Sequence, residues 1–221
     1  MRTLVVVPAY NEAAVIAKTL RGLLDAVDAD VLVVDDGSWD NTAGIASTFR
    51  RVRVARHMLN MGLGASLETG LEAARRGGYD RLVTFDADGQ HNPEDVLRLI
   101  DALGGCDLAI GVRRVYFERM PPVKRFGNFM LNMLTWLIFG VRCGDSQSGL
   151  RAFNRKALES VRVRASRYEV SSEILYEASR NRLRVGEVPV EVIYTEHSIR
   201  RGTSVVDGFK ILWRMILHRR I

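Results

Sequence analysis

The segment LVTFDADGQHNPED, residues 82–95, joins a short apolar run to a polar turn and then to the start of a helix. The run at 82–85 has the length and β-branched content of a buried strand. Asn92 is a helix-cap residue, Pro93 suits a first helical turn, and the two acids that follow suit the positive end of a helix dipole. This segment therefore predicts a strand that leads into a helix at 93–103.

The same order of elements recurs along the first half of the chain. Apolar, β-branched runs predict strands at 3–7, 30–34, 52–55, 82–85 and 107–111. Helical periodicity predicts helices at 11–27, 41–49, 64–76 and 93–103. This alternation predicts an α/β, Rossmann-like domain with a mostly parallel central sheet and helices on both of its faces.

The pattern changes after residue 111. A basic stretch, an apolar run, a strand, a helix, a second strand and a terminal helix follow in that order. These segments are 113–125, 126–141, 149–153, 168–182, 185–193 and 205–220. No linker rich in Gly, Ser or Pro separates them from the first half, so we expect a single domain.

Composition limits the classes of protein that fit. The net charge of +6 over 221 residues favours an anionic partner such as a nucleotide or a phospholipid head group. Nucleic acid is not an expected partner, because no recognition motif is present. The mean hydropathy of -0.03 argues against a polytopic membrane protein. The 2 distant cysteines, and an N-terminal apolar run too short for a signal peptide, predict a cytoplasmic location.

Polar residues follow three of the predicted strands. The first strand leads into PAYNE at 8–12, the second into DDGS at 35–38, and the fourth into DADGQ at 86–90. Asp, Gly and Ser are ordinary turn formers, so each cluster alone also fits a simple turn. In an open α/β sheet, however, ligands bind beyond the carboxyl ends of the strands. Three clusters on one rim therefore predict a ligand site.

Asp86 and Asp88 are the most informative residues of this rim. Two carboxylates this close repel each other unless a cation or a proton relieves them. A hard cation such as Mg²⁺ suits carboxylate oxygens and shares its coordination shell with substrate phosphates. Gln90 and His91 are placed to add a ligand or to orient one. The alternative is a capped turn before the next helix, which needs no metal.

A family resemblance rests on five segments, in this order: VVVPAYNE (5–12), VVDDGSWDNT (33–42), NMGLGAS (60–66), FDADGQHNPED (85–95) and GDSQSGLRAF (144–153). Together they resemble the family 2 glycosyltransferases of the GT-A fold. Within that family the chain is most similar to the polyprenyl-phosphate sugar synthases, such as the dolichol-phosphate mannose synthases. The resemblance implies transfer of a hexose from a nucleotide-diphosphate sugar to dolichyl or undecaprenyl phosphate. GDP-mannose, UDP-glucose and UDP-N-acetylglucosamine all remain open as donors.

The resemblance also implies roles for individual residues. Donor contacts are expected from Pro8, Tyr10, Glu12, Asp36, Gly64, Asp86 and Arg201. The ligands of Mg²⁺ or Mn²⁺ are expected to be Asp86, Asp88 and Gln90. Catalytic roles are expected for Asp88, Arg113, Arg125 and Asp145. Guanidinium groups match phosphate oxygens, so the arginines fit either an acceptor phosphate or the donor diphosphate.

The expected chemistry depends on the acceptor. Departure of the nucleotide diphosphate builds up negative charge, which a divalent metal neutralises. A phosphate acceptor is already an anionic nucleophile, so Asp145 would only orient its neighbours. If the acceptor is instead a glycan or another hydroxyl, Asp145 becomes the candidate base. No residue stands out as a covalent nucleophile, so inversion at the anomeric carbon is expected.

Two other classes of protein share some of these features. A non-catalytic nucleotide-binding protein docked on a membrane would share the fold, but the intact pair of Asp86 and Asp88 argues against it. A dinucleotide-dependent oxidoreductase needs G-x-G-x-x-G directly after the first strand. The first strand leads into PAYNE instead, and Leu67 stands where the third glycine of 62–70 belongs. That class is therefore excluded.

Membrane contact is predicted to be peripheral, at the cytoplasmic face. The helix at 205–221 is basic and amphipathic, which fits a lipid interface or packing on the core equally well. The apolar run at 126–141 has 16 residues, fewer than the roughly 20 that span a bilayer. A separate membrane protein is a further candidate partner. The domain would divide into a nucleotide-sugar half at 1–111, an acceptor half at 112–204 and the terminal helix.

Overall fold

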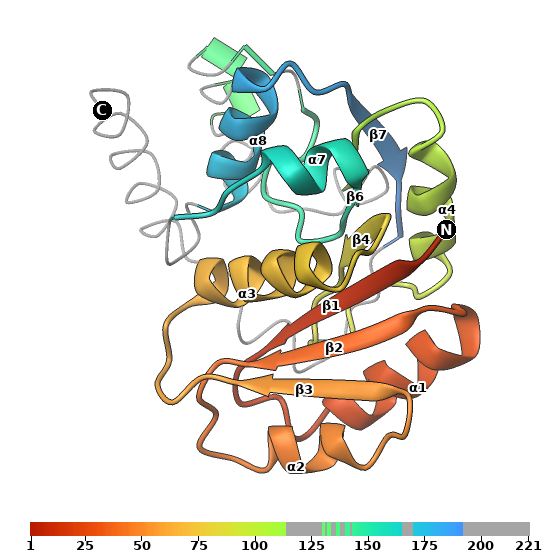
Figure 1. Cartoon of the computed structure of the whole chain (residues 1–221), viewed down its shortest axis with the longest axis vertical. Coiled ribbons are helices and arrows are strands. Elements are labelled where there is room, and N and C mark those ends of the chain that lie inside the picture. The colour runs from red at the N-terminus through yellow and green to blue at the C-terminus, as the bar shows by residue number, and fades with distance from the viewer. Residues whose placement is uncertain are drawn as a thin grey trace.

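A seven-stranded sheet forms the centre of the molecule, in the order β3-β2-β1-β4-β6-β5-β7 (Figure 1). The structure is a computed structural model that describes residues 1–113, 130, 132–133, 136–137, 140–141, 143–164 and 170–191. Its strands are β1 (Thr3–Ala9), β2 (Asp30–Asp35), β3 (Val52–Arg56), β4 (Arg81–Thr84), β5 (Leu108–Val112), β6 (Arg151–Asn154) and β7 (Val185–Pro189).

Strand direction places the predicted polar clusters on one edge. β1 pairs in parallel with β2 and with β4, and β2 pairs in parallel with β3. β6 is antiparallel to β4 and to β5, so β4 and β5 run in the same direction. β7 is again parallel to β5. The mostly parallel sheet is therefore confirmed, and the carboxyl ends of β1, β2, β4 and β5 lie on the same edge.

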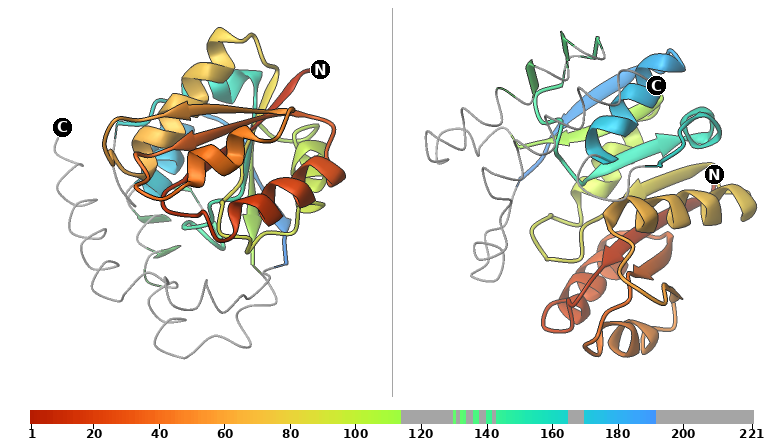
Figure 2. Two further views of the ribbon diagram at one scale, coloured as in Figure 1. Left: turned by 90° about the horizontal axis from the view of Figure 1, so that it is seen from below. Right: turned by 90° about the vertical axis from the view of Figure 1, so that its left-hand side faces the viewer.

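Helices cover both faces of the sheet, as predicted. They are α1 (Ile16–Ala26), α2 (Thr42–Ser47), α3 (Leu63–Arg76), α4 (Asp95–Ala102), α7 (Arg155–Ser160) and α8 (Val170–Arg180). Side chains of β1 alternate between the faces: Val5 packs in the cluster with Leu20 of α1, and Val6 packs in the cluster with Leu71 of α3. The left view of Figure 2 shows α1 and α2 on one side of the strands and α3 on the other.

Most predicted elements are found, with shifted ends. The helix predicted at 11–27 begins only at Ile16, because the chain first makes a turn in which Val15 N–H donates to the Glu12 carbonyl at 3.0 Å. The strand predicted at 185–193 is described as Val185–Pro189. α7 was not predicted. It has 6 residues, too few to show helical periodicity, and its cap is the last residue of β6, Asn154, whose side chain accepts from Ala157 N–H at 3.0 Å.

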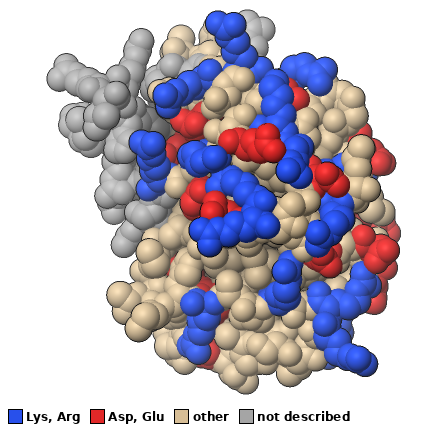
Figure 3. All heavy atoms as spheres, viewed as in Figure 1, with Lys and Arg blue, Asp and Glu red and all other residues tan. Residues whose placement is uncertain are grey.

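Charged side chains on the face of α3, α7 and α8 are mixed rather than gathered by sign. Figure 3 shows Lys and Arg interspersed with Asp and Glu across this face. Several of them form pairs, such as Arg76 with Glu72 at 2.7 Å and Arg155 with Glu159 at 2.8 Å. Exposed pairs of this kind stabilise a protein by about 1 kcal/mol at most. The net positive charge therefore does not mark this face as a binding surface.

The segments on which membrane contact was predicted are described only in part. The terminal helix predicted at 205–221 lies outside the described residues, and the run at 126–141 is described at scattered positions. In the part of the chain that is described, no helix is long and apolar enough to cross a membrane. The interfacial role of the terminal helix remains a prediction.

One buried carboxylate ties β5 to two neighbouring segments. Asp107 accepts hydrogen bonds from Arg184 N–H at 2.8 Å, from the Asn154 amide at 3.0 Å and from the Lys156 ammonium at 3.1 Å. Burial raises the pKa of Asp107, but these three hydrogen bonds outweigh burial and bring its pKa down to about 2. The ionised form of Asp107 is thus favoured by folding.

Acid should therefore weaken the fold through Asp107. A folded-state pKa below the ordinary 3.8 gives stability that is present above about pH 4 and lost as the pH falls toward about 2. The contribution is about 2 kcal/mol at most. Urea unfolding at several pH values should show this loss in the wild type and a flatter profile in Asp107→Asn. The exposed Asp101→Asn change is the control, and an equal flattening there would contradict the assignment.

Candidate active site

The loops after β1 and β2 are joined by hydrogen bonds at the carboxyl edge of the sheet. Asn11 N–H donates to the Ser38 hydroxyl at 2.9 Å, and Glu12 N–H donates to the Thr42 hydroxyl at 2.9 Å. In the opposite direction, Trp39 N–H donates to the Asn11 side chain at 3.0 Å. These bonds run between residues of both loops, so the two loops form one wall of the site.

Three residues predicted to contact the donor lie on this wall. Pro8 is half-buried near the end of β1, and Glu12 is buried. Tyr10 is 40% exposed, so its ring is not the core aromatic that a structural role would require. An aromatic ring held at the rim can stack on a planar ligand. The geometry thus fits a nucleoside contact for Tyr10.

Asp36 organises the loop that precedes α3. Its carboxylate accepts from Met61 N–H at 2.9 Å and from Gly62 N–H at 2.7 Å, and it contacts His57 Nδ1 at 2.7 Å. The other ring nitrogen of His57 lies 2.9 Å from the Thr69 hydroxyl of α3. Asp36 therefore fixes the loop that precedes α3. Sequence reasoning missed His57, which carries no motif of its own.

Gly37 allows the loop before α3 to lie close to the end of β2. Gly37 has a φ of +71°, and a Cβ there would lie 2.5 Å from the backbone carbon of Leu59. Gly64 is buried in the first turn of α3, directly after the loop. A side chain at Gly37 would push this loop away from the end of β2. The donor contact of Gly64 stays a prediction.

Asp86 and Asp88 follow β4, and each is held by a neighbour in sequence. His91 Nε2 lies 3.0 Å from one oxygen of Asp86, and the His91 ring packs edge-on against Phe85. Gln90 donates to Asp88 twice, from its backbone N–H at 3.0 Å and from its side-chain amide at 2.6 Å. Gln90 and His91 therefore orient the two aspartates in this structure.

The two aspartates have opposite pKa shifts. Burial raises the pKa of Asp88, and the neighbouring charge of Asp86 raises it further, despite the hydrogen bonds from Gln90. Burial also raises the pKa of Asp86, but the hydrogen bond with His91 and the positive charges of His91 and Arg113 outweigh burial and lower it. A positive charge near both carboxylates is what would let them ionise together.

These groups suit a hard divalent cation that is shared with a ligand. Within residues 1–113 and the later described ranges, no group of three or more His, Cys, Asp or Glu could hold a metal. Two carboxylates supply only part of a coordination shell. Mg²⁺ is commonly held in this way, by one or two carboxylates together with substrate phosphates. Asp86 and Asp88 therefore fit the predicted metal, with most of the shell left to a phosphate ligand.

Asp145 lies across the site, paired with Arg113. Asp145 is 1% exposed, and Arg113 directly follows β5. Arg113 donates from Nη2 to one oxygen of Asp145 at 2.8 Å and from Nε to the other. Both oxygens of Asp145 are thus engaged by one guanidinium, which holds the two side chains in a fixed orientation. Arg125 and Arg201, also predicted for the site, lie outside the described residues.

Arg151 lies buried under the Asp145 loop, and sequence reasoning gave it no role. Its guanidinium donates to the carbonyls of Ser146 and Ser148 at 2.9 Å and of Ser171 at 3.3 Å. Burial lowers the pKa of Arg151, while the charges of Asp145 and other neighbours oppose that shift. The available signal was an arginine inside the apolar segment GLRAF, where a charge needs partners.

The Asp145 loop also closes against Asp86. A Cβ at Gly149 would overlap the carboxylate of Asp86, so a side chain there would displace Asp86 from its position. The Gly149 carbonyl accepts from the Thr84 hydroxyl at 2.6 Å. Segments far apart in the sequence thus assemble one site at the end of β4.

Two proteins with similar sequences are named as sugar transferases that act on a polyprenyl phosphate. The sequence profile of glycosyl transferase family 2 matches residues 4–162. A UDP-N-acetylglucosamine–dolichyl-phosphate N-acetylglucosaminyltransferase of Methanococcus voltae is 39% identical over 96% of this chain and 94% of that protein. An undecaprenyl-phosphate mannosyltransferase of Micrococcus luteus is 33% identical over 94% of this chain and 88% of that protein.

A solved structure has the same fold. The glucosyl-3-phosphoglycerate synthase of Mycobacterium tuberculosis, crystallised with uridine diphosphate, aligns with a TM-score of 0.75 at 22% identity. The alignment covers 100% of this chain and 80% of that one. Another crystal of that enzyme holds Mn²⁺ together with uridine diphosphate. At this identity the likeness confirms the GT-A fold.

Proposed function

The chain belongs to glycosyl transferase family 2, and from that premise we propose that it moves a hexose, with inversion, from a nucleotide-diphosphate sugar to a polyprenyl phosphate. One observation carries the proposal: the aspartates after β4 share an edge of the sheet with an arginine held by a buried carboxylate. The first group suits a donor diphosphate with its cation. The second suits an acceptor phosphate.

The donor extends from the loops of β1 and β2 to the end of β4. Tyr10, Pro8 and Glu12 contact the nucleoside, above the loop that Asp36 fixes. Asp86 and Asp88 would hold Mg²⁺ or Mn²⁺, which neutralises the charge of the leaving diphosphate. This layout agrees with the nucleotide sugar in the name of the Methanococcus voltae relative and with the uridine diphosphate in the solved structure.

The acceptor phosphate binds at Arg113. In the sheet order, β5 lies two positions beyond β4, on the side away from β1 and β2. Arg113 is nevertheless close enough to Asp86 for its charge to lower the pKa of that carboxyl. Because Asp145 is engaged by Arg113, the acceptor has to be nucleophilic without a strong base. A phosphate meets that condition, and a sugar hydroxyl does not.

The rest of the chain fits the same scheme. Donor contacts other than Arg201 fall within 1–111, and acceptor contacts fall within 112–204, where Arg125 adds a second cation for phosphate. Arg201 contacts the donor diphosphate. The helix at 205–221 holds the protein at the cytoplasmic face of a membrane, where a polyprenyl phosphate is presented.

Transfer of label tests the proposal. With a radiolabelled nucleotide hexose, Mn²⁺ and undecaprenyl phosphate in detergent, label should move into the organic phase, and EDTA should stop the transfer. The product should have the anomeric configuration opposite to that of the donor. A panel of GDP-mannose, UDP-glucose and UDP-N-acetylglucosamine identifies the sugar. Transfer to a glycan but to no lipid phosphate, or full activity in EDTA, would contradict the proposal.

A further inference from the structure

The side chain of Asn132 bridges the backbone on both sides of Asp145. Its amide nitrogen donates to the Gly144 carbonyl at 2.6 Å, and its amide oxygen accepts from Ser146 N–H at 3.0 Å. One side chain therefore pairs with the chain as a neighbouring strand would. Asp145 stands between the two bonds, so its backbone is fixed at both ends.

This bridge is connected through Asp145 to Arg113, the proposed acceptor arginine. Asp145 is buried, and both of its oxygens bind the guanidinium of Arg113. A paired planar fork has a defined position and orientation, unlike a free arginine side chain. Moving the backbone of Asp145 would therefore move the guanidinium. The contacts run from Asn132 through Asp145 to Arg113.

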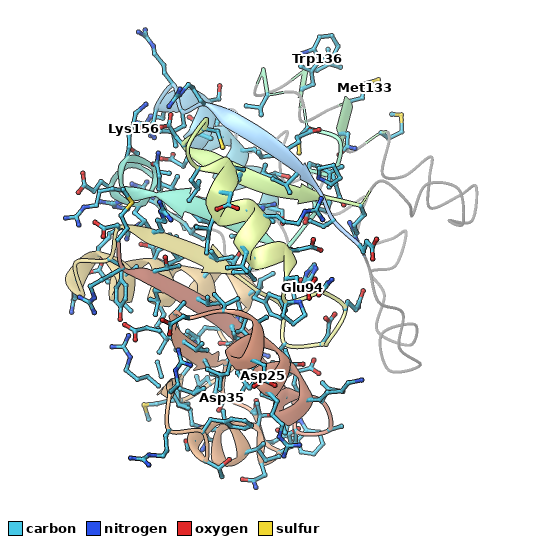
Figure 4. The ribbon with its side chains drawn as sticks, turned by 90° about the vertical axis from the view of Figure 1, so that its right-hand side faces the viewer. Asp25, Asp35, Glu94, Met133, Trp136 and Lys156 are labelled. Carbon is cyan, nitrogen blue, oxygen red and sulfur yellow. The ribbon has the colours of Figure 1, made fainter. Side chains whose placement is uncertain are left out.

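We propose that Asn132 is a positioning residue for the acceptor phosphate, acting through Asp145 on Arg113. The inference rests on the proposed function, because it assumes that Arg113 binds that phosphate. Asn132 belongs to the apolar segment 126–141, in which Trp136 is 42% and Leu137 60% exposed. Figure 4 shows Met133 and Trp136 at the outer edge of the molecule. The segment that presents apolar side chains thus also sets the arginine for the phosphate.

Asn132→Leu tests the proposal, because leucine has nearly the same size and makes neither hydrogen bond. The KM for undecaprenyl phosphate should rise about tenfold, since small displacements of a positioning group have large effects. The KM for the nucleotide sugar should stay within about twofold. Asn181→Leu is the matched control: its amide donates to the Glu177 carbonyl at 2.8 Å, at the end of α8. That variant should lose similar stability without any change in acceptor KM.

A double-mutant cycle separates positioning from a general structural role. If Asn132 acts through Arg113, Asn132→Leu should raise the KM for undecaprenyl phosphate by less than about twofold when Arg113 is already replaced by alanine. Independent, multiplying effects would overturn the proposal. So would an equal rise in the KM of donor and acceptor.

Amide exchange keeps the proposal separable from the proposed function. Exchange at Ser146 should be faster in Asn132→Leu than in the wild type, and unchanged exchange would overturn the positioning contact itself. If the wild type transfers label to no lipid phosphate while exchange does respond, the proposed acceptor is wrong and the contact stands. In that case Asn132 still positions Asp145, but the proposal that it positions an arginine for the acceptor phosphate is wrong.

Discussion

Asp88→Asn is expected to lower kcat by about 10²–10³-fold while leaving the fold at least as stable as before. The loss is of the size seen when one preorganised charge-stabilising group is removed from an active site. Asparagine has nearly the shape of aspartate, and its side-chain oxygen can still accept from Gln90 N–H. It lacks the negative charge that would hold a cation against the leaving diphosphate.

The stability of this variant follows from the environment of Asp88. Burial and the charge of Asp86 raise the pKa of Asp88, so ionisation of Asp88 opposes folding. A carboxyl with a raised folded-state pKa costs stability above that pKa and not below it. At neutral pH and without metal, the neutral amide removes that cost. A residue that lowers stability while it enables activity is typical of an active site.

Two measurements check this prediction. Thermal unfolding without metal should give a midpoint for Asp88→Asn at or above that of the wild type. Adding Mn²⁺ with a nucleotide diphosphate should raise the wild-type midpoint, since a ligand at 100 times its Kd adds about 2.7 kcal/mol, and should hardly move the variant. Glu94→Gln, which removes one exposed charge from the same loop, is the control. A variant that keeps both the metal response and the transfer would refute the role of Asp88.

The position of the polar clusters on one edge of the sheet was predictable because their residues are encoded locally. Each polar cluster directly follows a strand, and parallel strands bring their ends to one edge. Asp86 and Asp88 are separated by one residue, so their mutual repulsion follows from the sequence alone. The predicted ends of these strands lie within a few residues of the observed ends, because short β-branched runs that are buried on both faces are typical of parallel strands.

The acceptor side was harder to predict because it depends on contacts between distant segments. Asp145 meets Arg113 across 32 positions, and Gly149 meets Asp86 across β6 and β4. The family resemblance placed Asp145 near the reacting centre, but its partner decides whether it is a base or an anchor. The guanidinium of Arg151 donates to three backbone carbonyls, and every residue type carries a carbonyl, so the sequence does not reveal these partners.

Replacing Arg151 with methionine is expected to destabilise the protein by about 3–5 kcal/mol, as when one partner is removed from a buried charged network. The carbonyls of Ser146, Ser148 and Ser171 would lose their donor inside the protein. The thermal midpoint should fall by roughly 10 °C. Arg151→Lys should lose less, because an ammonium still donates to part of this set but cannot match the planar fork.

Activity should fall together with stability, because Arg151 supports the loop that carries Asp145. The control is Arg155→Met in the neighbouring helix, where the arginine is 54% exposed and pairs with Glu159, so a change within about 0.5 kcal/mol is expected. Transfer assays well below the midpoint of each variant separate a misplaced loop from an unfolded protein. If folded Arg151→Met transfers the sugar at the wild-type rate, the carbonyl contacts only stabilise the fold. If Arg151→Met is instead as stable as Arg155→Met, the hydrogen bonds of the buried guanidinium only balance the cost of removing it from water, and the predicted destabilisation is wrong.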